Sequence, residues 1–245
     1  MTVRGLVLRA RDLKESDRLL TVLTDSMGKQ IFLAKGARRK GSRIRSASQL
    51  LTYNEFSVFE YKNWMHVDEA ETLEAFFCLR GDLDRLSVAS YFCELLEAVT
   101  DSDSVDPEVL QLALNSVYAL SDGSRDARIV KSGFELRIMC LAGYEPMIGS
   151  CSVCISGTPD FFSVQKGVAC CSTCARQLGD NTLRPIDPAV HAAMHHIIES
   201  PVKKIFSFRM TEPSLKLLSN ITEAYVISQL ERSFDTLDFI KGLQI

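Results

Sequence analysis

The spacing of apolar residues changes from a period of two to a period of 3.6 near residue 76, and this change constrains the fold most. Before it, short apolar runs are separated by turn signals such as Asp25-Ser26-Met27-Gly28. After it, apolar side chains recur at helical spacing, as at Leu83, Leu86 and Cys93. The first period is typical of strands and the second of helices. The sequence therefore predicts an α+β chain whose strands come first.

Five strands are expected in the first part of the chain, at residues 5–10, 17–24, 30–34, 51–61 and 65–73. Only one long gap interrupts them, between the third and the fourth. A small closed barrel suits this pattern, and the five-stranded OB-type barrel binds its ligands on one face and its loops. We expect a nucleic-acid-binding OB-fold domain at residues 1–77 and a mainly α-helical domain at residues 78–245.

Aspartate followed by proline twice marks the start of a helix, at Asp106-Pro107 and at Asp187-Pro188. Aspartate caps the first turn, and proline fits the first helical position. We expect these helices to end near residues 120 and 199. Further helices are predicted at residues 124–141, with Gly143 placed to end it, and from Thr211 to about residue 232.

The gap between the third and fourth strands holds residues 35–45, here called the basic segment. It has no acidic residue, two glycines, and six basic residues: Lys35, Arg38, Arg39, Lys40, Arg43 and Arg45. A flexible cationic loop between strands can hold a polyanion by its phosphates. The alternative is a solvated charge run without a partner. Further basic residues could form a second rank: Arg9, Arg11, Lys14 and Arg18.

The formal net charge of −3 hides an asymmetry along the chain. Residues 1–62 hold 13 Lys and Arg against 6 Asp and Glu, a net +7, while residues 63–245 carry a net −10. Positive charge concentrated at one end steers an anionic ligand to that end. A nearly neutral chain therefore remains compatible with binding of nucleic acid.

Five aromatic residues lie near the basic segment: Tyr53, Phe56, Phe59, Tyr61 and Trp64. Those that face outward could stack on bases. We expect more of them in the barrel core than on its surface, and the sequence does not distinguish the two groups.

Two CxxC pairs, Cys151/Cys154 and Cys171/Cys174, are separated by 16 residues within an insertion at about residues 150–184. Two such turns can complete a tetrahedral Cys₄ zinc shell. Four thiolates leave no open coordination position, so we expect one structural zinc ion per chain. Cys170 could replace Cys171 as the third ligand, although the CxxC spacing favours Cys171.

The remaining cysteines and a histidine pair suggest no second site. Cys78, Cys93 and Cys140 lie in apolar helical runs and are expected to be core thiols. His191 and His195 are four residues apart on a predicted helix, but the glutamate of an HExxH motif is missing, so a helix surface is favoured. No apolar run approaches the ~18 residues that span a bilayer, and the N-terminal residues do not form a signal peptide. We expect a cytoplasmic protein without a membrane association, in which eight cysteines suggest metal binding.

Taken in order, these parts resemble the bacterial DNA repair and recombination RecO family. The matching stretches cover essentially the whole chain: Gly5-Leu-Val-Leu-Arg, Asp17-Arg-Leu-Leu, Lys35-Gly-Ala-Arg-Arg, Phe134-Glu-Leu-Arg, Gly143-Tyr-Glu-Pro and the two CxxC pairs. One departure is Cys170-Cys171, where the family usually has a single cysteine. The spacing from Gly167 points to Cys170 as the ligand, whereas the CxxC spacing points to Cys171.

The resemblance implies an OB fold, a helical C-terminal domain and, as in most members, a zinc finger. It also implies a recombination mediator that acts at the nucleoid, binds single- and double-stranded DNA and anneals complementary strands. Such proteins act with RecR to load RecA onto strands coated by single-strand-binding protein (SSB), whose acidic, apolar C-terminal tail they recognise. A candidate groove for that tail surrounds Ile205, Phe206 and Phe208, with Lys203, Lys204 and Arg209 as its basic rim, although an amphipathic surface segment is the favoured interpretation of this stretch.

Two other interpretations of the function are compatible with these features. An RNA-binding OB protein with a zinc ribbon would have the same parts. A thiol enzyme would use CxxC for redox chemistry, but redox pairs usually begin a helix near a βαβ pattern, and we expect this of neither pair here. The sequence shows no paired carboxylates, nucleophile elbow or phosphate-binding loop, so we expect no enzymatic activity.

Overall fold

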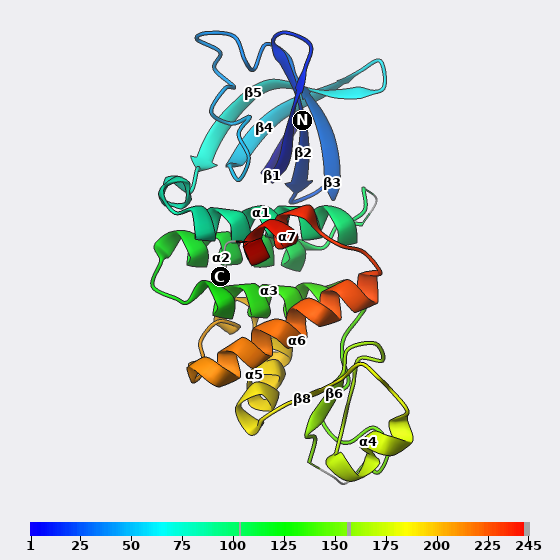
Figure 1. Ribbon diagram of the computed structural model, residues 1–245. Coiled ribbons are helices and arrows are strands. Elements are labelled where there is room, and N and C mark those ends of the chain that lie inside the picture. Colours follow the sequence, from blue (N-terminus) through cyan, green and yellow to red (C-terminus); the bar gives the residue numbers. More distant parts are fainter. Residues whose placement is uncertain (103, 156–157, 243–245) are drawn as a thin grey trace. The chain divides into compact units, whose positions relative to one another are not determined.

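The computed structural model describes residues 1–102, 104–155 and 158–242, arranged in two compact units (Figure 1). The first, here called the barrel unit, comprises Met1–Asp122 and Phe234–Ile245; the second, the cysteine unit, comprises Gly123–Ser233. Residues 156–157 of the predicted insertion and residues 243–245 of the predicted helical domain lie outside the described residues.

Five strands close into a barrel in the order β1-β2-β3-β5-β4. Their bounds are Thr2–Leu13 (β1), Asp17–Thr24 (β2), Lys29–Ala34 (β3), Tyr53–Tyr61 (β4) and Trp64–Glu74 (β5). Strands β3 and β5 pair in parallel, and the other neighbours are antiparallel. The predicted OB-type barrel is therefore confirmed. Strand β4 begins at Tyr53, two residues later than predicted, because Leu51 has a positive φ of 60°.

Alternate residues of each strand fill the barrel. Side chains that are at most 8% exposed form its core: Val3, Val7, Leu20, Val22, Phe32, Ala34, Ala37, Ile44, Ala47, Phe56, Val58 and Val67. The rings of Phe32 and Phe56 meet edge to face, with centroids 5.6 Å apart. Three core residues, Ala37, Ile44 and Ala47, come from the gap between β3 and β4, so this gap contributes to the packed barrel.

Helices complete the barrel unit: the 3₁₀ turn η1 (Phe77–Gly81), α1 (Leu83–Val99), α2 (Pro107–Asp122) and α7 (Asp235–Gly242). The helix predicted at Asp106-Pro107 is present as α2, and Asp106 accepts a 2.8 Å hydrogen bond from the Glu108 N–H. Helix α7 was not predicted. It packs on α1, where the Glu94 carboxylate accepts a 3.1 Å hydrogen bond from the Thr236 N–H.

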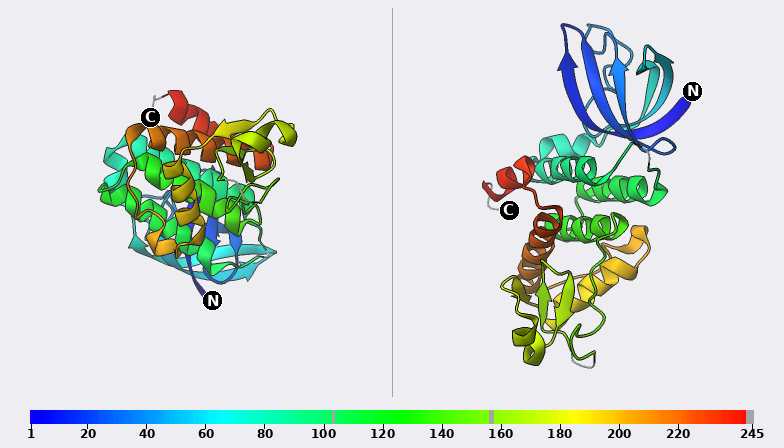
Figure 2. Two further views of the ribbon diagram at one scale, coloured as in Figure 1. Left: turned by 90° about the horizontal axis from the view of Figure 1, so that it is seen from below. Right: turned by 90° about the vertical axis from the view of Figure 1, so that its right-hand side faces the viewer.

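The cysteine unit combines helices with a small sheet (Figure 2). Its elements are α3 (Ala127–Leu141), β6 (Phe161–Ser163), β7 (Val168–Cys170), α4 (Ser172–Leu178), β8 (Leu183–Pro185), α5 (Pro188–Glu199), the 3₁₀ turn η2 (Val202–Lys204) and α6 (Glu212–Leu230). Helices α3, α5 and α6 pack together, and the strands form an antiparallel sheet in the order β7-β6-β8. The predicted cap of α5 is present, since Asp187 accepts a 2.7 Å hydrogen bond from the Val190 N–H.

A buried ion pair joins α3 to α6. The Lys131 ammonium lies 2.9 Å from the Glu135 carboxylate and 2.8 Å from that of Glu223. The Thr222 hydroxyl donates a 2.7 Å hydrogen bond to Glu135. Burial raises the pKa of Glu135, while Lys131 and Thr222 oppose that rise.

The two compact units do not coincide with the change from strands to helices along the chain. Helices α1 and α2 belong to the barrel unit, whereas the two domains expected at residues 1–77 and 78–245 follow the change from strands to helices. Those domain boundaries stay a prediction. Among the described residues, no helix combines the length and the apolar character that crossing a bilayer requires.

Candidate nucleic-acid interface and metal centre

The basic segment is fixed to the barrel by its apolar residues and presents its cations to solvent. Ala37 is fully buried, and Ile44 is only 8% exposed. The side chains between these anchors point outward, and all six predicted cations are exposed: Lys35, Arg38, Arg39, Lys40, Arg43 and Arg45. The segment is therefore anchored more firmly than its two glycines suggested.

Backbone hydrogen bonds hold the first turn of this segment against the β1–β2 turn. The Gly36 N–H donates to Asp17 Oδ1 at 2.8 Å, and the Arg38 N–H donates to the Ser16 carbonyl at 2.9 Å. The Gly36 hydrogen bond lowers the pKa of Asp17. Gly36 and Gly41 have φ of 66° and 80°, a backbone region that glycine adopts without strain.

Acidic neighbours already neutralise some of the predicted cations. Asp12 lies 3.3 Å from Arg38 and 2.9 Å from Arg18, and Arg9 pairs with Glu97 of α1 at 2.8 Å. Within the described part of the chain, the other predicted DNA-contacting residues form no ion pair: Lys35, Arg39, Lys40, Arg43, Arg45 and Arg11. Their positive charge is available to an anionic ligand.

The surface on one side of Arg43 is acidic. A groove of about 510 Å³ lies there, lined by Arg43 and Ile44 together with Glu55, Asp68 and Glu71. Carboxylates repel phosphates, so this groove does not suit a nucleic-acid backbone.

The aromatic residues fall into two groups. Phe56 lies in the barrel core and Tyr53 is partly buried. Phe59, Tyr61 and Trp64 are exposed by 48%, 52% and 47%. The expectation that most of the five would lie in the core is wrong, since three of them face solvent at the β4–β5 hairpin.

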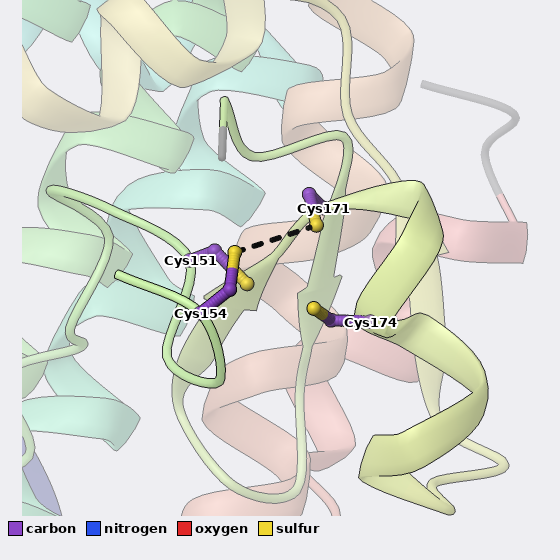
Figure 3. A group of neighbouring side chains, drawn as sticks. All are labelled: Cys151, Cys154, Cys171 and Cys174. Atoms are coloured by element: carbon purple, nitrogen blue, oxygen red, sulfur yellow. Dashed lines mark hydrogen bonds between the residues drawn. The ribbon is translucent and has the colours of Figure 1, made fainter. Parts of the chain in front are cut away.

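The four cysteines of the two CxxC pairs come together, and their sulfur atoms converge (Figure 3). Cys151 and Cys154 lie in the turns before β6, Cys171 precedes α4, and Cys174 lies in its first turn. The expectation that neither pair begins a helix is therefore wrong for the second pair, although the neighbouring strands are antiparallel and form no βαβ unit. All four sulfurs lie within 4.8 Å of one another, and those of Cys154 and Cys171 are 3.9 Å apart. A tetrahedral shell with Zn–S bonds of about 2.3 Å requires sulfurs roughly 3.8 Å apart. The donor set and its spacing therefore fit a zinc ion.

Cys170 is not a member of this group of four sulfurs, although it is buried on β7 and packs against it. Burial raises the pKa of Cys170. Hydrogen bonds from the backbone N–H groups of Cys154 and Cys171 lower the pKa of Cys151 to about 6, which favours the thiolate that binds metal. The geometry thus brings Cys171 to the site, as the CxxC spacing indicates.

The other cysteines differ from one another. Cys93 is buried as predicted and Cys140 is partly buried, but the prediction of a core thiol is wrong for Cys78, which is exposed on η1. A 3₁₀ turn follows the barrel there, in place of a buried helix.

His191 and His195, two of the three histidines on α5, have separate partners. His191 Nε2 lies 2.7 Å from the Ile148 carbonyl oxygen, and His195 lies 3.5 Å from the exposed Glu199. Neither belongs to a group of three or more potential metal ligands among the described residues. This agrees with the expected helix surface.

The candidate groove for an acidic tail lacks its apolar floor. Lys203, Lys204 and Arg209 are exposed, but Ile205 is fully buried and Phe206 is 6% exposed. The candidate groove is therefore not present, because Ile205 and Phe206 pack into the cysteine unit, and the favoured interpretation of an amphipathic surface segment fits this stretch.

Comparison with known proteins accounts for nearly the whole chain. Residues 1–76 match the family described as "Recombination protein O N terminal", and residues 80–238 match "Recombination protein O C terminal". Similar proteins include the "DNA repair protein RecO" of Acetivibrio thermocellus, 34% identical over 98% of this chain and 95% of its own length. The "DNA repair protein RecO" of Desulforudis audaxviator is 32% identical over 98% of this chain and 96% of its own length. Because both family matches and these relatives follow the whole succession from barrel to cysteine cluster, the chain belongs to the recombination protein O (RecO) family.

Proposed function

We propose that this chain is a non-enzymatic recombination mediator in DNA repair. It binds single- and double-stranded DNA without sequence preference and anneals complementary strands. Together with RecR it helps to load RecA onto single strands coated by SSB, whose C-terminal tail it recognises. It does so in the cytoplasm, at the nucleoid. Family membership supports the role in repair, and the anchored basic segment supports the contact with DNA.

The observation that carries the proposal is the exposure of six cations on a segment whose backbone is tied to an OB-type barrel. Lysine and arginine contact phosphates without reading base edges. Two strands that bind such a surface lose their mutual repulsion, while their bases remain able to pair. Sequence-tolerant binding and annealing therefore follow from the same cations.

The cysteine cluster has a structural role in this proposal. Zinc would be held by Cys151, Cys154, Cys171 and Cys174, and when bound it supplies a cross-link between the two CxxC turns. The backbone N–H groups that stabilise the Cys151 thiolate prepare the cluster for a cation. With four thiolate ligands no coordination position is left for a substrate.

The proposal is tested by annealing of complementary SSB-coated strands, with and without the protein, in the absence of ATP. We expect the wild-type protein to accelerate annealing and the variant with Arg39, Lys40 and Arg43 changed to alanine to lose most of this effect. A matched control removes three exposed lysines of the cysteine unit, Lys203, Lys204 and Lys216. Equal annealing by all three proteins would remove the basic segment from the mechanism.

The alternative function, binding of RNA, is tested in the same series. The aromatic and cationic groups described above accept either sugar, so the comparison is one of affinity and activity. Preference for single-stranded RNA over DNA, without acceleration of DNA annealing, would favour that alternative.

A further inference from the structure

The outer surface of the barrel carries a continuous apolar face next to the basic segment. Since Leu20 and Phe32 point into the core, their neighbours Leu19, Ile31 and Leu33 point outward. Leu19 pairs with Leu33 in the β2–β3 ladder, and Leu33 pairs with His66 of β5. Cross-strand partners share a face, so these side chains form one row. Ile31 is 53% exposed, which is unusual for an isoleucine in the middle of a strand.

Three exposed aromatic rings extend this row at the β4–β5 hairpin. Phe59 pairs with His66 across the two strands, and their rings stack with centroids 5.3 Å apart at 16°. Tyr61 pairs with Trp64, and the Lys62 ammonium lies 5.3 Å from the centre of the Tyr61 ring. We call Ile31, Leu33, Phe59, Tyr61 and Trp64 the outer aromatic face.

The geometry of the hairpin turn keeps these rings accessible. Lys62 and Asn63 have φ of 50° and 61°, which produces a tight two-residue turn. The hairpin extends beyond the barrel in Figure 1. A groove of about 490 Å³ lies beside it, lined by Ile31 and Trp64, by the polar side chains of Gln30 and Asn63, and by Lys29 and Glu97. The Glu97 carboxylate is neutralised by its ion pair with Arg9.

Cations border the outer aromatic face, which identifies its occupant. Arg11 pairs with Leu19 in the β1–β2 ladder and is exposed at one end of the apolar row. The basic segment continues directly from β3, whose Ile31 and Leu33 belong to the face. Exposed aromatic rings bordered by positive charge complement the bases and phosphates of a single strand. The acidic groove beside Arg43 lies over β4 and β5 away from this hairpin, and it excludes phosphates from that side.

We infer that the outer aromatic face is a base-stacking site for single-stranded nucleic acid, distinct from the phosphate contacts of the basic segment. This inference rests on the proposed function and deepens it. A base can stack on Phe59, Tyr61 or Trp64 only when it is unpaired, whereas the basic segment accepts either form of DNA. The outer aromatic face therefore adds affinity for single strands only, beside the phosphate contacts that both forms of DNA make.

Stacking also suits the annealing reaction. A protein ring covers the face of a base and leaves its hydrogen-bonding edge open. A strand held in this way is extended and still able to pair with its complement. Pairing then removes the bases from the rings, so the duplex is released from the outer aromatic face while phosphate contacts persist.

The chain offers a direct probe of this site, because Trp64 is its single tryptophan. The test is a titration of the full-length protein with oligothymidylate at low salt, followed by tryptophan fluorescence. Stacking on thymine is expected to quench the fluorescence of Trp64. A blunt duplex of the same length, added until the same fraction of the protein is bound, is expected to leave this fluorescence nearly unchanged. Equal quenching by both DNA forms, or no quenching on binding of the single strand, would overturn the inference.

Substitutions then separate this site from the basic segment. Phe59→Leu and Tyr61→Leu keep an apolar side chain and remove the ring, and each is expected to weaken single-strand binding about tenfold, the range for one stacked base. Their affinity for duplex is expected to change less than twofold. Tyr118→Leu, at a 63% exposed tyrosine on α2, is the matched control.

The outcomes distinguish the two ideas. Loss of single-strand binding alone supports the stacking site. Wild-type affinity in both Phe59→Leu and Tyr61→Leu refutes it, while the basic segment can still bind DNA. If instead the wild-type protein binds neither DNA form, the proposed function fails, and a protein partner becomes the occupant to be sought for this face.

Discussion

The backbone N–H of Gly36 donates a 2.8 Å hydrogen bond to Oδ1 of Asp17 and thereby fixes the first turn of the basic segment to the start of β2. Asp17 is acidic, so if charge alone mattered, removal of its carboxylate should raise the affinity for the phosphates of DNA. The bond and the charge therefore predict opposite effects on DNA affinity, which makes this residue informative.

Replacement of Asp17 by alanine is expected to lower the affinity for single-stranded DNA two- to threefold, because the cations lose their fixed arrangement. The free energy of unfolding should fall by about 1 kcal/mol, a typical value for one partly exposed hydrogen bond. Glu15→Ala, at an exposed position two residues away, removes the same charge without a bond to the segment. Fluorescence anisotropy and urea unfolding measure the two quantities, and identical behaviour of both variants would contradict the assigned role.

The same bond predicts a dependence of stability on pH. The pKa of Asp17 is lowered in the folded chain by the Gly36 N–H, so Asp17 contributes stability above its unfolded pKa of about 3.9. That contribution is lost as the pH falls through the lower folded value. Urea unfolding between pH 5 and pH 2 should show the wild-type advantage over Asp17→Ala shrinking toward the acid end. An advantage that stays constant over this range would exclude Asp17 as its source.

Removal of several cations should change the response to salt. Three exposed cations form no ion pair with Asp or Glu among the described residues: Arg39, Lys40 and Arg43. Each can therefore release counterions from a bound strand. For single strands, the slope of log K against log salt falls by about 0.7 per phosphate contact. Changing all three to alanine should therefore make the slope about 2 units shallower in binding titrations from 50 to 300 mM NaCl. An unchanged slope would place the phosphate contacts elsewhere.

The buried pair in the cysteine unit predicts a strong effect on stability. Lys131→Met leaves Glu135, which is fully buried, without its countercharge. Breaking a buried ion pair in this way costs about 3–5 kcal/mol. The double variant Lys131→Met/Glu135→Gln should recover part of this loss in thermal unfolding, because the neutral amide keeps an acceptor for Thr222. A double variant no more stable than the single one would refute the explanation.

Metal analysis tests the cysteine cluster. We expect about one zinc ion per chain, and a lower unfolding temperature after chelation, since binding energy of the metal contributes to folding. Cys151→Ser should lose the ion. Cys170→Ser, a change of a neighbouring buried cysteine outside the group of four, should retain it. Loss of zinc from Cys170→Ser with retention in Cys171→Ser would reverse the assignment of the third ligand.

The sequence predicted those parts of the fold that depend on local patterns. Strand alternation and turn residues gave the barrel, and Asp187-Pro188 gave the start of α5, because caps and turns involve neighbours in the chain. Helix α7 escaped prediction since it is short and is held by a distant group, the Glu94 carboxylate, while Phe234 just before it contacts the ring of Tyr91. The eight residues of α7 do not themselves indicate which distant groups they contact.

The candidate site could be predicted only in part from the sequence, for a related reason. The six cations could be named because charge is a property of single residues. The outer aromatic face depends on which side of a strand each residue faces. In β2 and β3 apolar residues occupy both faces, so alternation does not separate Ile31 from Phe32. Likewise, the sequence alone does not show whether Ile205 and Phe206 are exposed in a groove or buried, and the structure buries both.

The return of α7 to α1 has a consequence for how this protein is made. The barrel unit contains Phe234–Ile245, so all of Gly123–Ser233 must be synthesised before the residues that complete it leave the ribosome. During that interval Tyr91 lacks its edge-to-face contact with Phe234, the residue just before α7. The residues that complete the barrel unit are therefore synthesised after the whole of the cysteine unit.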